Sequence, residues 1–166
     1  MKQLLTYINE AEGSKIIDAM KNALKEELNA WYGYIIVKEW LTGTVHKDIE
    51  KFYEDTAKDE LKDHAYWLMK RINQLGGTIE DITMSPNSWE TATHKYIAPT
   101  WLKNNIDIKK SIEDNIKNEE GAIETYEELV KMTEDIDSES NTKLKEILAD
   151  EQEHLQKLKN FLQDIK

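Results

Sequence analysis

The stretch from Leu144 to Ile165 constrains the fold more than any other part of this sequence. Its apolar residues recur in steps of three and four, which is typical of the buried seam of an amphipathic helix. Two ionisable residues, Glu151 and His154, lie within that seam, one helical turn apart on the same face. A buried charge without a partner is strongly unfavourable. The helix therefore requires a partner for this pair, and we expect a metal ion.

Composition limits the chemistry that is open to the chain. Its 166 residues suit one domain over residues 1–166, and none of them is cysteine. Disulfides, iron–sulfur clusters, thiolate zinc sites and cysteine nucleophiles are thereby excluded, so oxygen and imidazole must hold any metal. The formal net charge of −11 argues against nucleic-acid binding but suits attraction of cations. No segment reads as a signal peptide or a membrane span, so we expect a cytoplasmic protein without membrane partners.

Three more helices are predicted ahead of this one. The periodicity places them at residues 14–42, 46–75 and 105–133, with Ser14 as the first N-cap and a short leading helix over residues 1–12. A short turn makes the first two antiparallel neighbours. Residues 76–104, with both prolines and an expected short helix at Asn87–His94, are long enough to return to the far end of a bundle. The sequence therefore predicts an all-α, antiparallel four-helix bundle with one long crossover between its second and third helices.

Each predicted seam contains an acid near the middle of its helix. The acids are Glu27, Glu60, Glu119 and Glu151 in chain order, and the second helix adds His64. Glu26 is turned about 100° away from Glu27 along the helix and is expected to face solvent. Glu27 precedes Glu60 by 33 residues and Glu119 precedes Glu151 by 32, so the four helices resemble two copies of one hairpin.

These mid-helix positions should meet at one height of the bundle. Four carboxylates and two imidazoles would then converge in a dry core, where four negative charges repel one another strongly. Two divalent cations would neutralise them. Hard carboxylates with two imidazoles suit iron or manganese, whereas zinc prefers fewer ligands. The residues alone thus predict a di-metal carboxylate bundle.

The pattern resembles the ferritin-like family, in particular bacterioferritins and Dps-like proteins with a bacterioferritin-type di-iron centre. The resemblance runs from about residue 14 to residue 165 and includes the segment HAYWLMKRINQLGG in the second helix. It implies two iron ions, with manganese or zinc as substitutes. The implied metal ligands are Glu27, Glu60, His64, Glu119, Glu151 and His154. Tyr34 and Tyr126, each seven residues after a lone acid, are expected to hydrogen-bond to these carboxylates.

The chain departs from the family pattern in three ways. Four residues separate Glu60 from His64, one more than usual, so either a π-type turn absorbs the extra residue or the geometry tolerates it. Asp63 would then lie beside the ligands or, less favourably, replace one. Leu61 occupies the position of the haem methionine of bacterioferritin, so no haem is expected. No sequence remains for the fifth helix of 24-subunit cages, which favours a homo-oligomeric dodecamer or a smaller assembly.

The resemblance selects iron chemistry among the di-metal possibilities. It implies a ferroxidase that oxidises Fe²⁺ with O₂ or H₂O₂, in iron storage or peroxide detoxification. One alternative is another di-metal enzyme, such as a manganese catalase or a rubrerythrin-like peroxidase. A second alternative is a non-catalytic helical scaffold with buried ion pairs. The acidic charge and the lack of a basic tail argue against the DNA protection known in the Dps family.

Overall fold

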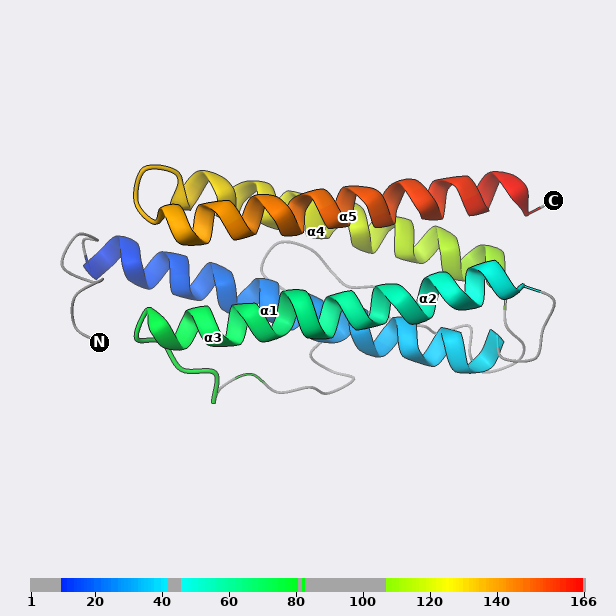
Figure 1. Ribbon diagram of the computed structural model, residues 1–166, viewed down its shortest axis with the longest axis horizontal. Coiled ribbons are helices and arrows are strands. Elements are labelled where there is room, and N and C mark those ends of the chain that lie inside the picture. The colour runs from blue at the N-terminus through cyan, green and yellow to red at the C-terminus, as the bar shows by residue number, and fades with distance from the viewer. Residues whose placement is uncertain (1–9, 42–45, 81, 83–106, 166) are drawn as a thin grey trace.

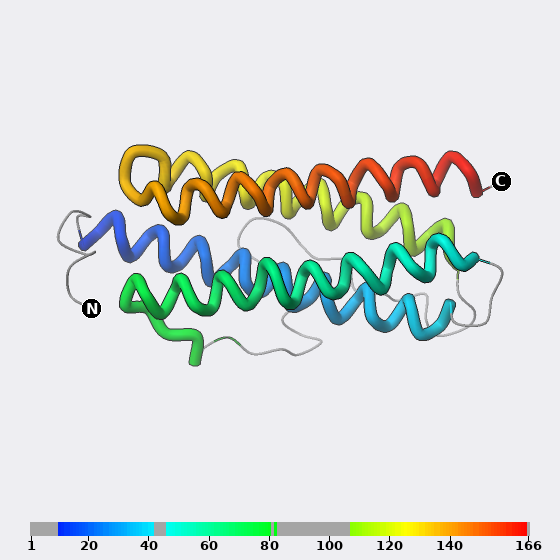
Figure 2. The backbone as a smooth tube through the Cα atoms, viewed as in Figure 1, coloured from blue at the N-terminus to red at the C-terminus, as the bar shows by residue number. Residues whose placement is uncertain are grey.

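The computed structural model describes residues 10–41, 46–80, 82 and 107–165, and within these it is all-helical (Figure 1). The elements are α1 (Glu10–Leu41), α2 (Lys47–Asp59), the π-helical segment η1 (Glu60–Ala65), α3 (Tyr66–Gln74), α4 (Ile108–Thr133) and α5 (Ser138–Asp164). Figure 2 shows that α2, η1 and α3 follow one another as one rod, so the described residues build four long helical rods. The predicted four-helix bundle is confirmed.

The rods form two hairpins that lie side by side. In the first, α1 packs against α2, η1 and α3, and in the second, α4 packs against α5. The rod of α2, η1 and α3 ends beside the start of α1, whereas α4 starts at the opposite end of the bundle (Figure 1). The end of α3 and the start of α4 thus lie at opposite ends of the bundle, as the predicted long crossover requires. The expected helix at Asn87–His94 lies outside the described residues.

Capping interactions set the helix ends, and two sequence predictions are wrong there. Ser14 is no N-cap, because α1 already begins at Glu10. The last residues of the expected leading helix belong to α1, and residues 1–9 lie outside the described residues. The last helix begins at Ser138 instead of Leu144. The cause is the side chain of Asp137, which accepts a hydrogen bond from the backbone N–H of Ser140 and caps the polar first turn of α5.

The end of α3 depends on two glycines, Gly76 and Gly77. Gly76 has a positive φ of 86° and donates to the carbonyl of Asn73, and Gly77 donates to the carbonyl of Ile72. This is the Schellman pair of hydrogen bonds, which closes a helix with a left-handed residue. A Cβ atom on Gly77 would lie 2.7 Å from Cγ2 of Ile17, so the turn also needs glycine for its packing against α1.

Two apolar clusters fill the bundle, one toward each end. The first includes Met20, Leu24, Leu68, Ile72 and Leu144, and the second includes Val37, Leu41, Ile49, Ile112 and Leu158. In α4, α5 and the rod of α2, η1 and α3, the ionisable seam residues fall between the positions that supply the two clusters, and in α1 Glu27 lies directly before Leu28, the last α1 residue of the first cluster. The polar layer is therefore closed off from both ends by hydrocarbon. Among the described residues, no helix has the length and apolarity that crossing a bilayer requires.

One end of the bundle also contains a buried cation. Arg71 of α3 is 1% exposed and donates from Nε to Ser140 Oγ (2.7 Å) and from Nη2 to Asp137 Oδ1 (2.6 Å). Its Nη1 donates to Gln74 at 3.1 Å and to Glu139 at 2.9 Å. We call Arg71, Asp137, Glu139 and Ser140 the arginine clamp, because they tie the first hairpin to the start of α5.

Candidate metal centre

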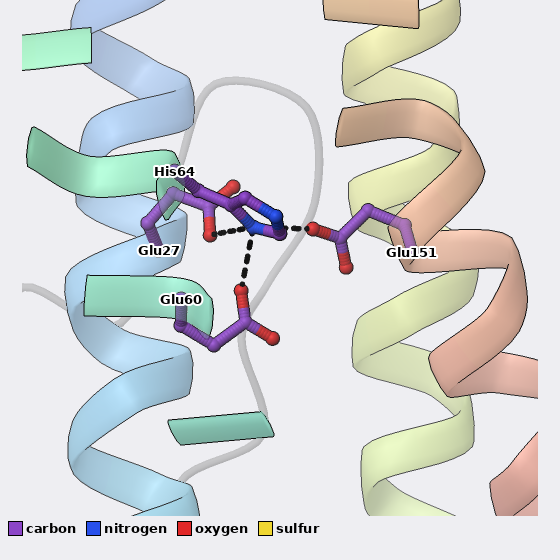
Figure 3. Close-up of side chains that lie close together, drawn as sticks. All are labelled: Glu27, Glu60, His64 and Glu151. Atoms are coloured by element: carbon purple, nitrogen blue, oxygen red, sulfur yellow. Dashed lines mark hydrogen bonds and ion pairs between the residues drawn. The ribbon is translucent and has the colours of Figure 1, made fainter. Parts of the chain in front are cut away.

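The six predicted ligands all point into the middle of the bundle. Each of these residues is at most 4% exposed. They come from α1 (Glu27), η1 (Glu60 and His64), α4 (Glu119) and α5 (Glu151 and His154). Figure 3 shows four of them, Glu27, Glu60, His64 and Glu151, with their polar ends turned toward one another.

The π-helical segment explains how Glu60 and His64 share one face. In an ordinary α-helix, a spacing of four turns the second residue about 40° past the first. The wider turn of η1 accommodates one extra residue, and both side chains remain inside the bundle. Of the two alternatives that the sequence left open, the structure has the π-type turn. Asp63, within the same turn, is exposed, so the prediction that it lies beside the ligands is wrong.

Three carboxylates surround one nitrogen of His64. Its Nδ1 lies 3.2 Å from Glu27 Oε2, 3.1 Å from Glu60 Oε2 and 3.0 Å from Glu151 Oε1 (Figure 3). A ring nitrogen carries at most one proton, so it cannot donate to three acceptors at once with good geometry. Donor atoms gathered in this way are typical of a site that holds a cation.

His154 occupies a similar place on the other side of the centre. Its Nδ1 lies 3.4 Å from Glu60 Oε1 and 3.7 Å from Glu151 Oε2. The centroids of the two imidazole rings are 6.3 Å apart. Both histidines therefore direct Nδ1 toward the same pair of acids, Glu60 and Glu151.

The donor atoms fall into two groups that fit two metal ions. In one group, donor atoms of Glu27, Glu60, His64 and Glu151 lie within 4.8 Å of one another, and in the other those of Glu60, Glu119, Glu151 and His154 do. Glu60 and Glu151 belong to both groups. Among the described residues, Glu60 Oε1, Glu151 Oε1 and His154 Nδ1 are buried without a hydrogen bond of good geometry, although each lies near an ionisable neighbour. Such orphaned atoms are costly unless a ligand satisfies them, so the residues fit a pair of cations.

Both tyrosines bind carboxylates across the two hairpins. The hydroxyl of Tyr34 in α1 donates to Glu119 Oε1 in α4, and that of Tyr126 in α4 donates to Glu27 Oε1 in α1. Burial raises the pKa of both phenols well above the usual value, and the neighbouring carboxylate raises it further. The two side chains therefore stay neutral donors, and each holds one lone acid in place.

Two aspartates that helical periodicity did not indicate contact the histidines. His64 Nε2 lies 3.5 Å from Asp150 Oδ2, and His154 Nε2 lies 3.8 Å from Asp59 Oδ2. Each carboxylate lies on the far side of its ring from the centre and favours the orientation in which Nδ1 faces the acids. The signal was present in the sequence, because an aspartate directly precedes both Glu60 and Glu151.

Glu26 contradicts the sequence prediction. It is 4% exposed, although we expected it to face solvent. The reason is that α1 packs against α4 as well as against its own hairpin partner, so its buried arc is wider than a single seam. Glu26 lies on the α4 side, where it lines a cavity together with Asn118.

The pKa values of the four glutamates separate into two classes. Burial, together with the charge of Glu60, raises the pKa of Glu27 well above its usual value, and burial with Glu151 does the same for Glu119. Burial and mutual repulsion also act on Glu60 and Glu151, but the imidazoles of His154 and His64 outweigh them and lower both pKa values. Burial thus favours the protonated form of Glu27 and Glu119, whereas the imidazoles favour the ionised form of Glu60 and Glu151.

The histidines complete this balance of charge. Burial would lower the pKa of each imidazole, yet the surrounding carboxylates raise both values well above the usual one. The carboxylates thereby favour the cationic form of each imidazole. Divalent cations would displace these protons, since carboxylates and imidazoles bind metals in their deprotonated forms.

Comparisons with known proteins agree with this geometry. The model of the ferritin-like domain matches residues 17–166, whereas no curated protein matches the chain. A bacterioferritin-related protein from Bacteroides fragilis, described as a dodecameric thioferritin, is 30% identical over 99% of this chain and 92% of its own, with a TM-score of 0.81.

Two more distant structures share the fold. A ferritin-like diiron-carboxylate protein from Bacillus anthracis is 22% identical, with a TM-score of 0.73 over 93% of this chain and 99% of its own. The bacterioferritin of Desulfovibrio desulfuricans is also 22% identical, with a TM-score of 0.75 over 94% of this chain and 82% of its own. The match of the domain model over nearly the whole length decides the family, and this chain belongs to the ferritin family.

Proposed function

We propose that this protein is a ferroxidase that binds two Fe²⁺ ions at the candidate metal centre and oxidises them with O₂ or H₂O₂. The observation that carries the proposal is the pair of overlapping donor groups, each with three carboxylates and one imidazole. These hard donors suit iron and stabilise its ferric form. The Bacillus anthracis relative is a diiron-carboxylate protein, and the structure of the Desulfovibrio desulfuricans bacterioferritin describes a diiron site in different catalytic states.

In this proposal, bound iron supplies the electrons, and the protein supplies a fixed and dry environment. Glu60 and Glu151 belong to both groups and would hold both ions. Tyr34 and Tyr126 hold the two remaining acids through neutral hydrogen bonds, which leaves the second oxygen of each acid for an ion. The apolar clusters on either side keep bulk water away from the centre.

Storage of the oxidised iron requires an enclosed space, which one chain does not provide. The relative from Bacteroides fragilis is dodecameric, and we propose that this chain also forms a homo-oligomer, with twelve subunits favoured. Iron storage and peroxide detoxification would then be two outcomes of the same oxidation.

The test is to load the protein with Fe²⁺ without oxygen, add O₂ or H₂O₂, and follow ferric absorbance by stopped flow. We expect a fast phase of about two Fe²⁺ per chain, because the two donor groups define two sites. Glu119→Gln should lose this phase. Glu120→Gln is the matched control, because Glu120 is the adjacent acid but is exposed and pairs with Lys159 on the surface at 3.1 Å.

Further additions of Fe²⁺ separate the proposal from its alternatives. Ferric iron that accumulates in a large assembly, seen by size-exclusion chromatography, supports storage. Rapid destruction of peroxide without any accumulated iron would contradict storage and favour a catalase or peroxidase. Absence of bound metal in elemental analysis would leave only a scaffold with buried ion pairs.

A further inference from the structure

The two histidines of the candidate metal centre lie in different kinds of turn. In the regular helix α5, His154 follows Glu151 by three residues. In the π-helical segment η1, His64 follows Glu60 by four. Both imidazoles nevertheless direct Nδ1 toward Glu60 and Glu151. The residue three after Glu60 is Asp63, so the first hairpin carries two potential ligands where the second hairpin carries one.

An aspartate can take the place of a histidine that binds a metal through Nδ1. The Nδ1 atom of histidine and the Oδ atoms of aspartate are all bonded to Cγ, so the two side chains reach equally far from the backbone. Asp63 is exposed in η1, but in an ordinary α-helix it would lie about 60° from Glu60 around the axis, on the same face. His154 has this relation to Glu151 in α5. The turn, and not the length of the side chain, therefore keeps Asp63 out of the centre.

Backbone hydrogen bonds show where the helix accommodates its extra residue. The N–H of Glu60 still donates to the carbonyl of Thr56, four residues earlier, as in an α-helix. The N–H of Tyr66 donates to the carbonyl of Leu61, five residues earlier. The wide turn thus lies between Glu60 and Tyr66. It would move toward α3 if each N–H within it exchanged a carbonyl five residues back for the one four residues back.

The packing of the rod permits such a shift of the wide turn. A shift by about one turn would change the direction chiefly of residues 61–67. Among these, only His64 and Ala65 are buried, and Ala65 has no more than a methyl group to place. Ile72 and Leu75 of the first apolar cluster lie beyond the wide turn in either arrangement and would keep their places. The core therefore does not fix the position of the turn.

We propose that Asp63 is an alternative ligand of the candidate metal centre and that the turn type of η1 selects between Asp63 and His64. With the wide turn at residues 60–65, the first donor group contains three carboxylates and an imidazole. With the wide turn moved toward α3, Asp63 replaces the imidazole, and the group contains four carboxylates. Imidazole suits iron and zinc, whereas carboxylates alone suit harder ions such as manganese. The inference rests on the metal centre of the proposed function but not on its oxidation chemistry.

The test measures by elemental analysis how many Mn²⁺ ions the full-length chain retains after dialysis. His64→Ala removes the imidazole, and we expect it to keep about two Mn²⁺ per chain, because Asp63 completes the first donor group. The double variant His64→Ala with Asp63→Asn should keep about one. The matched control is His64→Ala with Asp48→Asn, which should keep about two, because Asp48 is an exposed aspartate at the start of the same rod.

A deletion tests the turn itself. Removal of Lys62 takes the extra residue out of η1, so that His64 follows Glu60 by three residues, as the histidine of α5 follows its acid. Asp63 then follows Glu60 by only two residues and lies on another side of the helix. We expect the deletion to bind about two Mn²⁺ while His64 is present and about one when it is combined with His64→Ala. Circular dichroism spectra that match the wild type establish that each variant is folded.

The single variant Asp63→Asn tests the choice between ions. It should lower the affinity of the centre for Mn²⁺ by about tenfold, the low end of the losses caused by removing a residue that supports a metal site. The affinity for Zn²⁺ should stay unchanged, because His64 completes the group for that ion. Isothermal titration calorimetry measures both affinities. Equal losses for the two ions would contradict the selective role of Asp63.

Three further results would overturn the inference. The first is a Mn²⁺ content of His64→Ala that the addition of Asp63→Asn does not change. The second is a His64→Ala variant that keeps two Mn²⁺ even after removal of Lys62. The third is a wild-type chain that retains neither Mn²⁺ nor Zn²⁺, which would also remove the metal centre. The expected Mn²⁺ contents, combined with no oxidation of Fe²⁺, would support the role of Asp63 and contradict only the proposed ferroxidase reaction.

Discussion

The metal centre and the arginine clamp are both clusters of buried charge, but they are built in opposite ways. In the clamp, every nitrogen of the Arg71 guanidinium donates to an oxygen, and the partners come from two hairpins. In the centre, four acids share two imidazoles, and three buried ligand atoms make no hydrogen bond of good geometry among the described residues. In the clamp, every donor of Arg71 has an acceptor. In the centre, the acceptor atoms outnumber the protons available for hydrogen bonds.

The comparison shows how a binding site can be told from a structural ion pair. A closed cluster holds the fold together, and loss of one member leaves the others buried without a partner. An open cluster is instead completed by a ligand, so the metal-free protein gains little stability from it. The following changes test this difference, beginning with the largest expected effect.

Removal of an acid that both donor groups share should abolish metal binding. We expect Glu151→Ala to bind no divalent ion under conditions in which the wild type binds about two, because both groups use Glu151. Glu27→Ala should keep about one, since Glu27 belongs to only one group. Elemental analysis after dialysis against Co²⁺ measures both. Two ions retained by Glu151→Ala would contradict the assignment of the centre.

Removal of the clamp arginine should instead destabilise the fold. Arg71→Met leaves Asp137 buried without its cation, and such a change costs about 3–5 kcal/mol. Urea unfolding followed by circular dichroism measures the loss, and the folded variant should still bind two metal ions. The double variant Arg71→Met with Asp137→Leu, which removes both charges, should recover much of the stability. Equal losses in the single and double variants would show that the contribution comes from packing alone.

Acid should weaken the clamp in a predictable direction. Burial acts to raise the pKa of Asp137, but hydrogen bonds from Arg71 and Ser140 hold it below its usual value. A carboxyl with a lowered pKa in the folded state stabilises the protein above its unfolded pKa of about 4 and loses that contribution as the pH falls through the folded value.

This pH effect is the smallest of the three and is measured as a difference. The free energy of unfolding of the wild type should exceed that of Asp137→Asn by about 1.5 kcal/mol near neutral pH, as for a hydrogen bond to a charged group. The difference should shrink below about pH 4, where the unfolded carboxyl takes up its proton. The other carboxyl groups titrate in both the wild type and the variant, so their contributions cancel in the difference between the two free energies of unfolding. A difference that stays constant into acid would contradict the lowered pKa.

The sequence predicted those features of the centre that follow from the geometry of a single helix, namely which side chains of each helix face the interior of the bundle. Helical periodicity alone separates Glu119 from its exposed neighbour Glu120, and it places Glu151 and His154 on one face. The repeat between the hairpins then brings these positions to one height. Both inferences use only the constant geometry of the α-helix, so they hold before any packing is known. The π-type turn at Glu60 was left as one of two alternatives, because the spacing alone does not determine how a helix absorbs an extra residue.

Contacts between helices were decided by the tertiary structure. Asp150 reaches His64 and Asp59 reaches His154 across the two hairpins, so neither pairing follows from the periodicity of one rod. The burial of Glu26 depends on α4 as the second neighbour of α1, which the seam of α1 does not reveal. Local sequence fixes the direction in which a side chain leaves its helix. Only the packing of the rods determines what that side chain meets, because each contact needs a partner far away along the chain.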